Sequence, residues 1–292
     1  MLDTRIAAVQ MNCPVGKPSA NIATIARFLR QAKAGNVDIV CFLELGVSGY
    51  NTADATGRSV SGGPLPEPEP IPGPSSEKLA KLGRDLKIWF LAGILERDRS
   101  GIVFNTQGVF GTDGLIGTYR KTHVPTAEIG TFCHGADLPV FSHPKVRFGI
   151  EICYDSHFPE VSTALAERGA ELIFLPHASG GASRKGGEGE PAKDKKARWL
   201  RYMPARAYDN TVFVAVCNQA GENGAGRDFA GVSFICDPHG AVIAESKDAA
   251  RDEMVVADLR AADLSEARRV PGSFFRHFRR PELYDRWSRE RA

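Results

Sequence analysis

Ala34-Gly35-Asn36-Val37-Asp38-Ile39-Val40-Cys41-Phe42-Leu43-Glu44 is the stretch that decides the fold. It reads as a helix end, a glycine stop and an acidic residue, followed by a buried strand over 37–43 that finishes at a carboxylate. The same order recurs in Arg168-Gly169-Ala170-Glu171-Leu172-Ile173-Phe174-Leu175-Pro176-His177. Two such helix–strand units indicate an α/β protein with two related halves, although any α/β chain can repeat this pattern by chance.

The rest of the chain alternates strands and helices in the same way. Helices are predicted over 19–34, 75–86, 159–168 and 197–209, and strands over 6–11, 88–95, 102–110, 115–120, 146–152, 212–217, 232–236, 241–244 and 254–259. Ser75 is the predicted cap of its helix, and Pro204 is expected to break or kink the last helix. The proline-rich residues 57–74 predict a surface loop rather than a domain linker, because no change in composition follows them.

The composition is that of an ordinary folded chain. Of 292 residues, 25% are charged and 42% are apolar, which excludes disordered and collagen-like proteins. With 37 Lys and Arg against 35 Asp and Glu, the net charge of +2 argues against nucleic acid as a partner. The apolar runs are too short to span a bilayer and residues 1–6 do not resemble a secretory leader. We therefore expect one cytoplasmic domain over 1–292, without a membrane partner.

The six cysteines predict neither disulfides nor a structural zinc site. An even number could form three disulfides, but the chain is large, is not rich in cysteine and lacks a secretion signal. There is also no Cys-x-x-Cys pair. Cys41, Cys217 and Cys236 lie within apolar runs and are expected to be inert buried thiols.

Three segments carry residues suited to catalysis. Cys153 stands where the strand over 146–152 turns toward a helix, which predicts an exposed thiol whose pKa is lowered by helix N–H groups. Glu44 ends an apolar strand, and burial of a carboxylate strengthens it as a base. Lys121, in Tyr119-Arg120-Lys121-Thr122-His123, could stabilise a developing oxyanion. The alternatives are a packed cysteine, a solvated carboxylate and a surface lysine.

Together these segments resemble the nitrilase, or carbon–nitrogen hydrolase, superfamily in the order and spacing of Glu44, Lys121 and Cys153. Leu43 departs from the family, which usually has proline before the glutamate. The resemblance extends over nearly the whole chain and includes the following further stretches: Pro70-Ile71-Pro72-Gly73-Pro74, Ala205-Arg206-Ala207-Tyr208-Asp209-Asn210, Asp237-Pro238-His239-Gly240 and Arg279-Arg280-Pro281-Glu282-Leu283-Tyr284.

The resemblance implies a fold and an assembly. The fold is a single-domain, four-layer α-β-β-α sandwich. The assembly is a homodimer or a larger homo-oligomer, in which the basic, aromatic-rich tail 268–292 contacts another subunit.

The resemblance also implies the role of each site residue. Glu44 is the general base, Cys153 the nucleophile and Lys121 the oxyanion stabiliser. The backbone N–H of Tyr154 is the second oxyanion donor, and Glu128 orients Lys121 and the substrate. No metal or cofactor is needed.

The expected activity is hydrolysis of linear amides or N-carbamoyl compounds through an acyl-thioester. Tyr154-Asp155 after the nucleophile is typical of amidases and carbamoylases, whereas nitrilases tend to have Trp-Glu. The alternatives are a nitrilase and a catalytically silent binding protein on the same fold.

Other residues could line the substrate pocket. The candidates are Tyr50, Phe132 and His177, each of which could instead be packed in the core. The Gly- and Lys-rich stretch 180–196 could close over the pocket and bind a carboxylate, or it could be a solvated surface loop. Its cationic residues are Arg184, Lys185, Lys193, Lys195 and Lys196.

Overall fold

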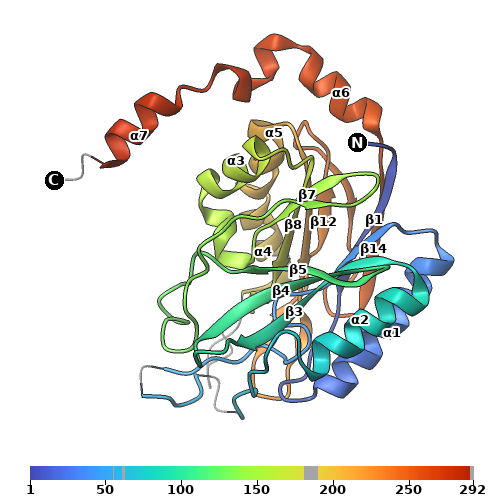
Figure 1. Ribbon diagram of the computed structural model, residues 1–292, viewed down its shortest axis with the longest axis vertical. Helices are drawn as coiled ribbons and strands as arrows, with labels where there is room; N and C mark the ends of the chain where they lie inside the picture. The colour runs from blue at the N-terminus through green and yellow to red at the C-terminus, as the bar shows by residue number, and fades with distance from the viewer. Residues whose placement is uncertain (55, 61–62, 181–189, 290–292) are drawn as a thin grey trace.

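The computed structural model describes residues 1–54, 56–60, 63–180 and 190–289. Two six-stranded mixed sheets lie face to face, and helices cover the outer side of each (Figure 1). This is the four-layer α-β-β-α arrangement that the family resemblance implies. Among these residues, no helix is both long enough and apolar enough to cross a bilayer.

The first sheet has the strand order β14-β1-β2-β3-β4-β5. Its central strands β1, β2 and β3 run parallel, and the other pairs are antiparallel. The strands are β1 (Thr4–Gln10), β2 (Ile39–Cys41), β3 (Trp89–Arg97), β4 (Val103–Gly111), β5 (Gly114–Arg120) and β14 (Glu253–Leu259). Helices α1 (Pro18–Ala34) and α2 (Pro74–Leu86) pack side by side over this sheet.

The second sheet has the order β13-β12-β9-β8-β7-β6, with β7, β8 and β9 parallel. Its strands are β6 (Phe141–Ser142), β7 (Arg147–Ile150), β8 (Leu172–His177), β9 (Phe213–Asn218), β12 (Phe234–Cys236) and β13 (Val242–Glu245). Helices α3 (Pro159–Glu167), α4 (Ala192–Trp199) and α5 (Met203–Asn210) lie on its outer side (Figure 1). A separate hairpin joins β10 (Ala220–Glu222) to β11 (Asp228–Ala230).

The two similar stretches of sequence form equivalent strands. The first contains β2 and the second contains β8, and each of these strands has a parallel neighbour on both sides. The chain therefore places one copy of the helix–strand unit at the centre of each sheet.

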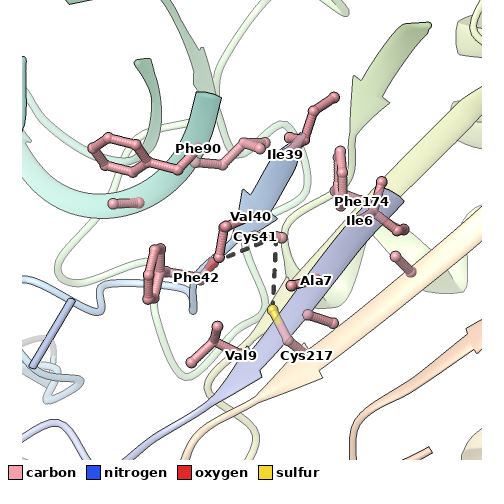
Figure 2. Close-up of a cluster of buried hydrophobic side chains, with 14 of the residues drawn as sticks. Ile6, Ala7, Val9, Ile39, Val40, Cys41, Phe42, Phe90, Phe174 and Cys217 are labelled. Atoms are coloured by element: carbon pink, nitrogen blue, oxygen red, sulfur yellow. Dashed lines mark hydrogen bonds between the residues drawn. The ribbon is translucent and has the colours of Figure 1, made fainter. Parts of the chain in front are cut away.

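The main core lies between the sheets. Cys41 and Phe90 from the first sheet, and Phe174 and Cys217 from the second, are completely buried. Figure 2 shows Cys41 and Cys217 facing each other across this interface, with their sulfur atoms 3.7 Å apart as free thiols. Cys236 is also buried, so the expected burial of these three cysteines is confirmed.

The start of α2 differs from the prediction, because Gly73 and not Ser75 is the N-cap. Pro74, whose fixed φ suits the first helical turn, begins the helix one residue earlier. The Gly73 N–H donates to Ser76 Oγ at 2.8 Å, and the Ser75 N–H donates to Glu69 Oε2 at 2.8 Å.

The expected break at Pro204 is confirmed. The helix predicted over 197–209 is two helices, α4 and α5, and Pro204 lies in the first turn of α5. Proline lacks the N–H that a continuous helix would need at this position.

The C-terminal arm consists of α6 (Ala261–Arg269), η2 (Pro271–Ser273), η3 (Phe275–Phe278) and α7 (Pro281–Arg289), and it extends away from the sheets (Figure 1). Phe275 contacts Tyr208 of α5, with ring centroids 5.4 Å apart. Further along, Phe278 and Tyr284 are 60% and 51% exposed. Aromatic residues are enriched at protein interfaces, and the role of this arm in subunit contacts stays a prediction.

Candidate active site

The candidate catalytic side chains come from three strand ends in two sheets. Glu44 follows β2 and Lys121 follows β5, both in the first sheet, while Cys153 follows β7 in the second. Glu44 and Lys121 are completely buried, and Cys153 is partly buried. Since the sheets pack face to face, residues far apart in the sequence reach one site.

Glu44 accepts hydrogen bonds on both carboxylate oxygens. Its Oε1 lies 2.8 Å from Asn105 Nδ2 and 2.8 Å from Lys121 Nζ, and its Oε2 lies 2.7 Å from the Ala178 backbone N. The Cys153 thiol lies beside Glu44, whose negative charge acts on it. Both carboxylate oxygens thus face donors, and the thiol whose proton Glu44 would accept lies next to them.

The turn that carries Glu44 presses against β3. Gly93 donates its N–H to the Leu43 carbonyl at 3.2 Å, and Leu45 has a left-handed φ of 48°. A Cβ at position 93 would lie 2.2 Å from the Leu45 backbone N. Only glycine permits this close approach, so Gly93 helps to set the position of Glu44.

Lys121 lies between two carboxylates. Its Nζ is 2.8 Å from Glu44 Oε1 and 2.8 Å from Glu128 Oε2, and Glu128 Oε1 accepts a 2.5 Å hydrogen bond from the Tyr50 hydroxyl. Burial works to lower the pKa of Lys121, but the two carboxylates outweigh it and leave this pKa well above its usual value. Lys121 is therefore a permanently charged ammonium.

Cys153 occupies a strained turn at the start of the 3-10 helix η1 (Cys153–His157). Its φ of 49° is in the left-handed region, which costs a residue with a side chain about 1–2 kcal/mol. The turn places the thiol beside Glu44, and Cys153 is partly buried rather than exposed as predicted.

The predicted lowering of the thiol pKa is wrong as well. Burial, together with the negative charge of Glu44, raises the pKa of Cys153 well above its usual value, and Lys121 opposes this shift only in part. A single 3-10 turn has too few aligned N–H groups to compensate. The resting group is a thiol that must lose its proton to a base.

The predicted pocket residues lie in different surroundings. Tyr50 and Phe132 are buried in one apolar cluster with Leu45, Val124, Ala178 and Phe229. Tyr154 is 37% exposed, and the role of its backbone N–H as an oxyanion donor stays a prediction. Contact of Phe132 with a substrate stays a prediction.

His177 is neutral at physiological pH. Its Nδ1 lies 2.8 Å from the Leu175 carbonyl, its ring packs on Trp199 at 4.6 Å, and burial lowers its pKa to about 4. Nδ1 is thus the protonated nitrogen, and Nε2 is buried without a hydrogen-bond partner. This nitrogen can accept a hydrogen bond, but the group cannot serve as a cation.

Sequence reasoning missed Asn105. Asn105 holds Glu44 with its side chain, and its carbonyl accepts the Lys121 backbone N–H at 2.9 Å. A polar residue inside the strand Val103-Phe104-Asn105-Thr106 is the signal that could have revealed it.

Lys195 on α4 lies near the base. Its side chain is 1% exposed, and Nζ is 3.0 Å from Ser179 Oγ and 3.3 Å from Glu190 Oε2. Ser179 follows Ala178, whose N–H binds Glu44. Arg184 and Lys185, proposed to bind a carboxylate, lie outside the described residues.

The described ranges contain no group of three or more His, Cys, Asp and Glu side chains that could hold a metal ion.

Comparison with known proteins points to one family. The profile described as carbon-nitrogen hydrolase matches residues 5–269. The human omega-amidase NIT2 is 30% identical over 97% of this chain and 98% of its own length. N-carbamoylputrescine amidase of Solanum lycopersicum is 29% identical over 96% of this chain and 93% of its own.

Solved structures share the fold. A cysteine-to-serine mutant of an amidase of the nitrilase superfamily from Nesterenkonia AN1 superposes with a TM-score of 0.77, at 22% identity and 98% coverage of both chains. Nit3 of Saccharomyces cerevisiae, from branch 10 of this superfamily, gives a TM-score of 0.77 at 26% identity, covering 92% of this chain and 95% of its own.

Proposed function

Because the chain belongs to the carbon–nitrogen hydrolase family, we propose that it hydrolyses small linear amides or N-carbamoyl compounds through an acyl-thioester on Cys153. The observation that carries this proposal is the buried contact of Glu44 with both the Lys121 ammonium and the Cys153 thiol. A base, a nucleophile and a fixed positive charge thereby share one site.

In the first half of the reaction, Cys153 Sγ attacks the carbonyl carbon while Glu44 takes the thiol proton. The negative charge that forms on the oxygen is stabilised by Lys121 and the Tyr154 N–H. The C–N bond then breaks, Glu44 returns the proton to the leaving nitrogen, and the acyl group remains on sulfur.

In the second half, a water molecule replaces the amine. Glu44 removes one proton from this water as its oxygen attacks the thioester carbon, and the same two donors stabilise the second oxyanion. The C–S bond breaks, and the proton held by Glu44 returns to sulfur. Glu128 keeps Lys121 in place throughout, through its 2.8 Å contact.

The first experiment is ammonia release from a panel of short amides, N-carbamoyl compounds and nitriles. The purified protein is assayed beside Cys153→Ala. We expect release from an amide or a carbamoyl compound that is lost in the variant. Conversion of a nitrile alone would favour the nitrilase alternative, and the absence of release from a folded protein across the panel would favour the silent binding protein.

The charge beside the base favours substrates that carry a carboxylate. Among the residues that the structure describes, Lys195 and Arg198 share a single acidic partner, Glu190, which leaves one positive charge in excess. A dicarboxylic acid monoamide should therefore be preferred to its neutral methyl ester.

The variant Lys195→Met tests this preference. It should raise KM for the anionic amide and leave KM for the ester unchanged. Lys193→Met is the matched control, because Lys193 is an exposed lysine on the same helix. Equal changes for both substrates would contradict the preference.

A further inference from the structure

Asp155 links the two segments that carry the nucleophile and the oxyanion-stabilising lysine. It is completely buried, two residues after Cys153 in η1. Its carboxylate contacts Ile152, which precedes Cys153, and three residues that flank Lys121 at the end of β5.

On one carboxylate oxygen, Asp155 joins the two sheets directly. Its Oδ2 accepts the Ile152 backbone N–H at 2.9 Å and the Tyr119 hydroxyl at 2.6 Å. Ile152 immediately precedes Cys153, and Tyr119 is the last but one residue of β5. One oxygen atom of Asp155 thus binds both the turn that carries Cys153 and the strand β5 that precedes Lys121.

The other oxygen holds the segment that follows Lys121. Oδ1 accepts the Thr122 hydroxyl at 2.9 Å and the His123 backbone N–H at 2.8 Å, and it lies 3.0 Å from His123 Nδ1. Hydrogen bonds to an ionised acceptor are short and strong, and in a buried site they specify one geometry. The residues on both sides of Lys121 are therefore tied to the turn of Cys153.

The turn needs such a restraint, because the left-handed φ of Cys153 is unfavourable. Two further hydrogen bonds lie within the turn: the Asp155 backbone N–H donates to the Ile152 carbonyl at 3.1 Å, and Ser156 Oγ donates to the Cys153 carbonyl at 2.7 Å. These bonds close the turn around Cys153 and keep its thiol against Glu44.

We infer that Asp155 is a positioning residue that sets Cys153 Sγ relative to Lys121 Nζ, through Ile152 on one side and Tyr119, Thr122 and His123 on the other. This inference rests on the proposed function for its catalytic consequence. Asp155 does not touch the substrate, so its loss should affect the rate of reaction much more than substrate binding.

The variant Asp155→Asn tests the inference, because its amide nitrogen replaces one of the two carboxylate oxygens and cannot accept the hydrogen bonds made there, whichever way the amide is turned. We expect kcat to fall by about 100-fold, as for an ångström-scale misplacement of reacting groups, with KM within about twofold. Once the turn is no longer restrained, the Cys153 thiol moves away from the buried position beside Glu44 that raises its pKa. More of it is then ionised at pH 8, so its alkylation by iodoacetamide should become several-fold faster. Peptide mapping separates Cys153 from the exposed Cys133.

Glu151→Gln is the matched control. Glu151 is an equally buried acid on the other side of Cys153, but its hydrogen bond goes to Ser162 of α3 and not to β5. Its kcat and alkylation rate should stay within about twofold of the wild type. An equal loss in both variants would overturn the inference, and so would a normal kcat or an unchanged alkylation rate in Asp155→Asn.

Tyr119→Phe keeps the test decisive should Asp155→Asn fail to fold. It removes one donor and leaves the carboxylate, so kcat should fall by about tenfold without a change in KM. Full activity in this variant would overturn the inference. If the wild type hydrolyses no amide, the proposed function fails, but the alkylation rates of the variants still test the position of Cys153.

Discussion

The two halves of the candidate site are built differently. The half from the first sheet, Glu44, Lys121, Glu128 and Tyr50, is a buried chain of hydrogen bonds between side chains. The half from the second sheet presents Cys153 on a strained turn and restrains it through the backbone of its neighbours. The charged groups of the first half are thus paired with one another, whereas the neutral thiol of the second half is held in place by its backbone turn.

This difference predicts a separation of stability from activity. Buried charges are costly without partners, so the first half contributes to both folding and chemistry. A partly buried thiol contributes little to folding, so Cys153 itself should matter for chemistry alone. Four predictions, ordered by expected effect, test the contrast.

Lys121→Met should have the largest effect, because it leaves Glu44 and Glu128 buried with no cation between them. Removing a donor to the oxyanion should lower kcat by about 10²–10³-fold. Removing one member of a buried ionic cluster should also destabilise the fold by about 3–5 kcal/mol. Ammonia release and thermal unfolding measure the two effects.

Cys153→Ala should lose activity while its melting temperature stays near that of the wild type. If Lys121→Met had wild-type stability, the two halves of the site would not differ in their contribution to folding.

Gly93→Ala should displace the turn of Glu44 without changing any polar group. The added Cβ would lie 2.2 Å from the Leu45 backbone N, so the backbone must move. We expect kcat to fall by about 100-fold and the fold to lose about 1–3 kcal/mol. Gly272→Ala, where a Cβ meets no atom within 4 Å, is the control. Equal behaviour of the two variants would show that the turn tolerates movement.

Asn105→Leu should have a smaller effect, because Glu44 keeps its contacts with Lys121 and Ala178. Losing one donor to the base should lower kcat by about tenfold, which corresponds to one ordinary hydrogen bond to a charged group. Steady-state kinetics with the preferred amide measure this change. An unchanged kcat would mean that Lys121 and the Ala178 N–H are sufficient to hold the carboxylate.

Glu151 should make stability depend on pH without affecting the chemistry. Burial raises the pKa of Glu151 to about 8 from 4.5. Because the folded state holds this proton more tightly than the unfolded state, the stabilisation is complete below pH 4.5 and is lost as the pH rises toward 8. The melting temperature of the wild type should therefore fall between these limits more steeply than that of Glu151→Gln. Parallel melting curves would contradict the assignment.

Local patterns predicted much of the fold. Apolar periodicity located the strands and helices, and the similarity between residues 34–44 and 168–177 correctly suggested the central strands β2 and β8. The helix cap was misplaced by two residues, because Pro74 and Ser75 both suit the start of a helix and tertiary contacts chose between them.

The sequence by itself determined which residues are available for chemistry. A carboxylate after one apolar strand, a lysine after another and a cysteine after a third can be read from composition and order, since each depends only on neighbours in the chain. Their family resemblance predicted the set Glu44, Lys121, Glu128 and Cys153.

Only the tertiary structure decided the protonation state and the supporting contacts. The pKa of Cys153 rises because packing the two sheets together buries it beside Glu44, an effect that no local pattern contains. The roles of Asn105, Gly93 and Asp155 likewise arise from contacts between segments far apart in sequence. Electrostatic energy depends on distance and burial in space, and folding alone sets both.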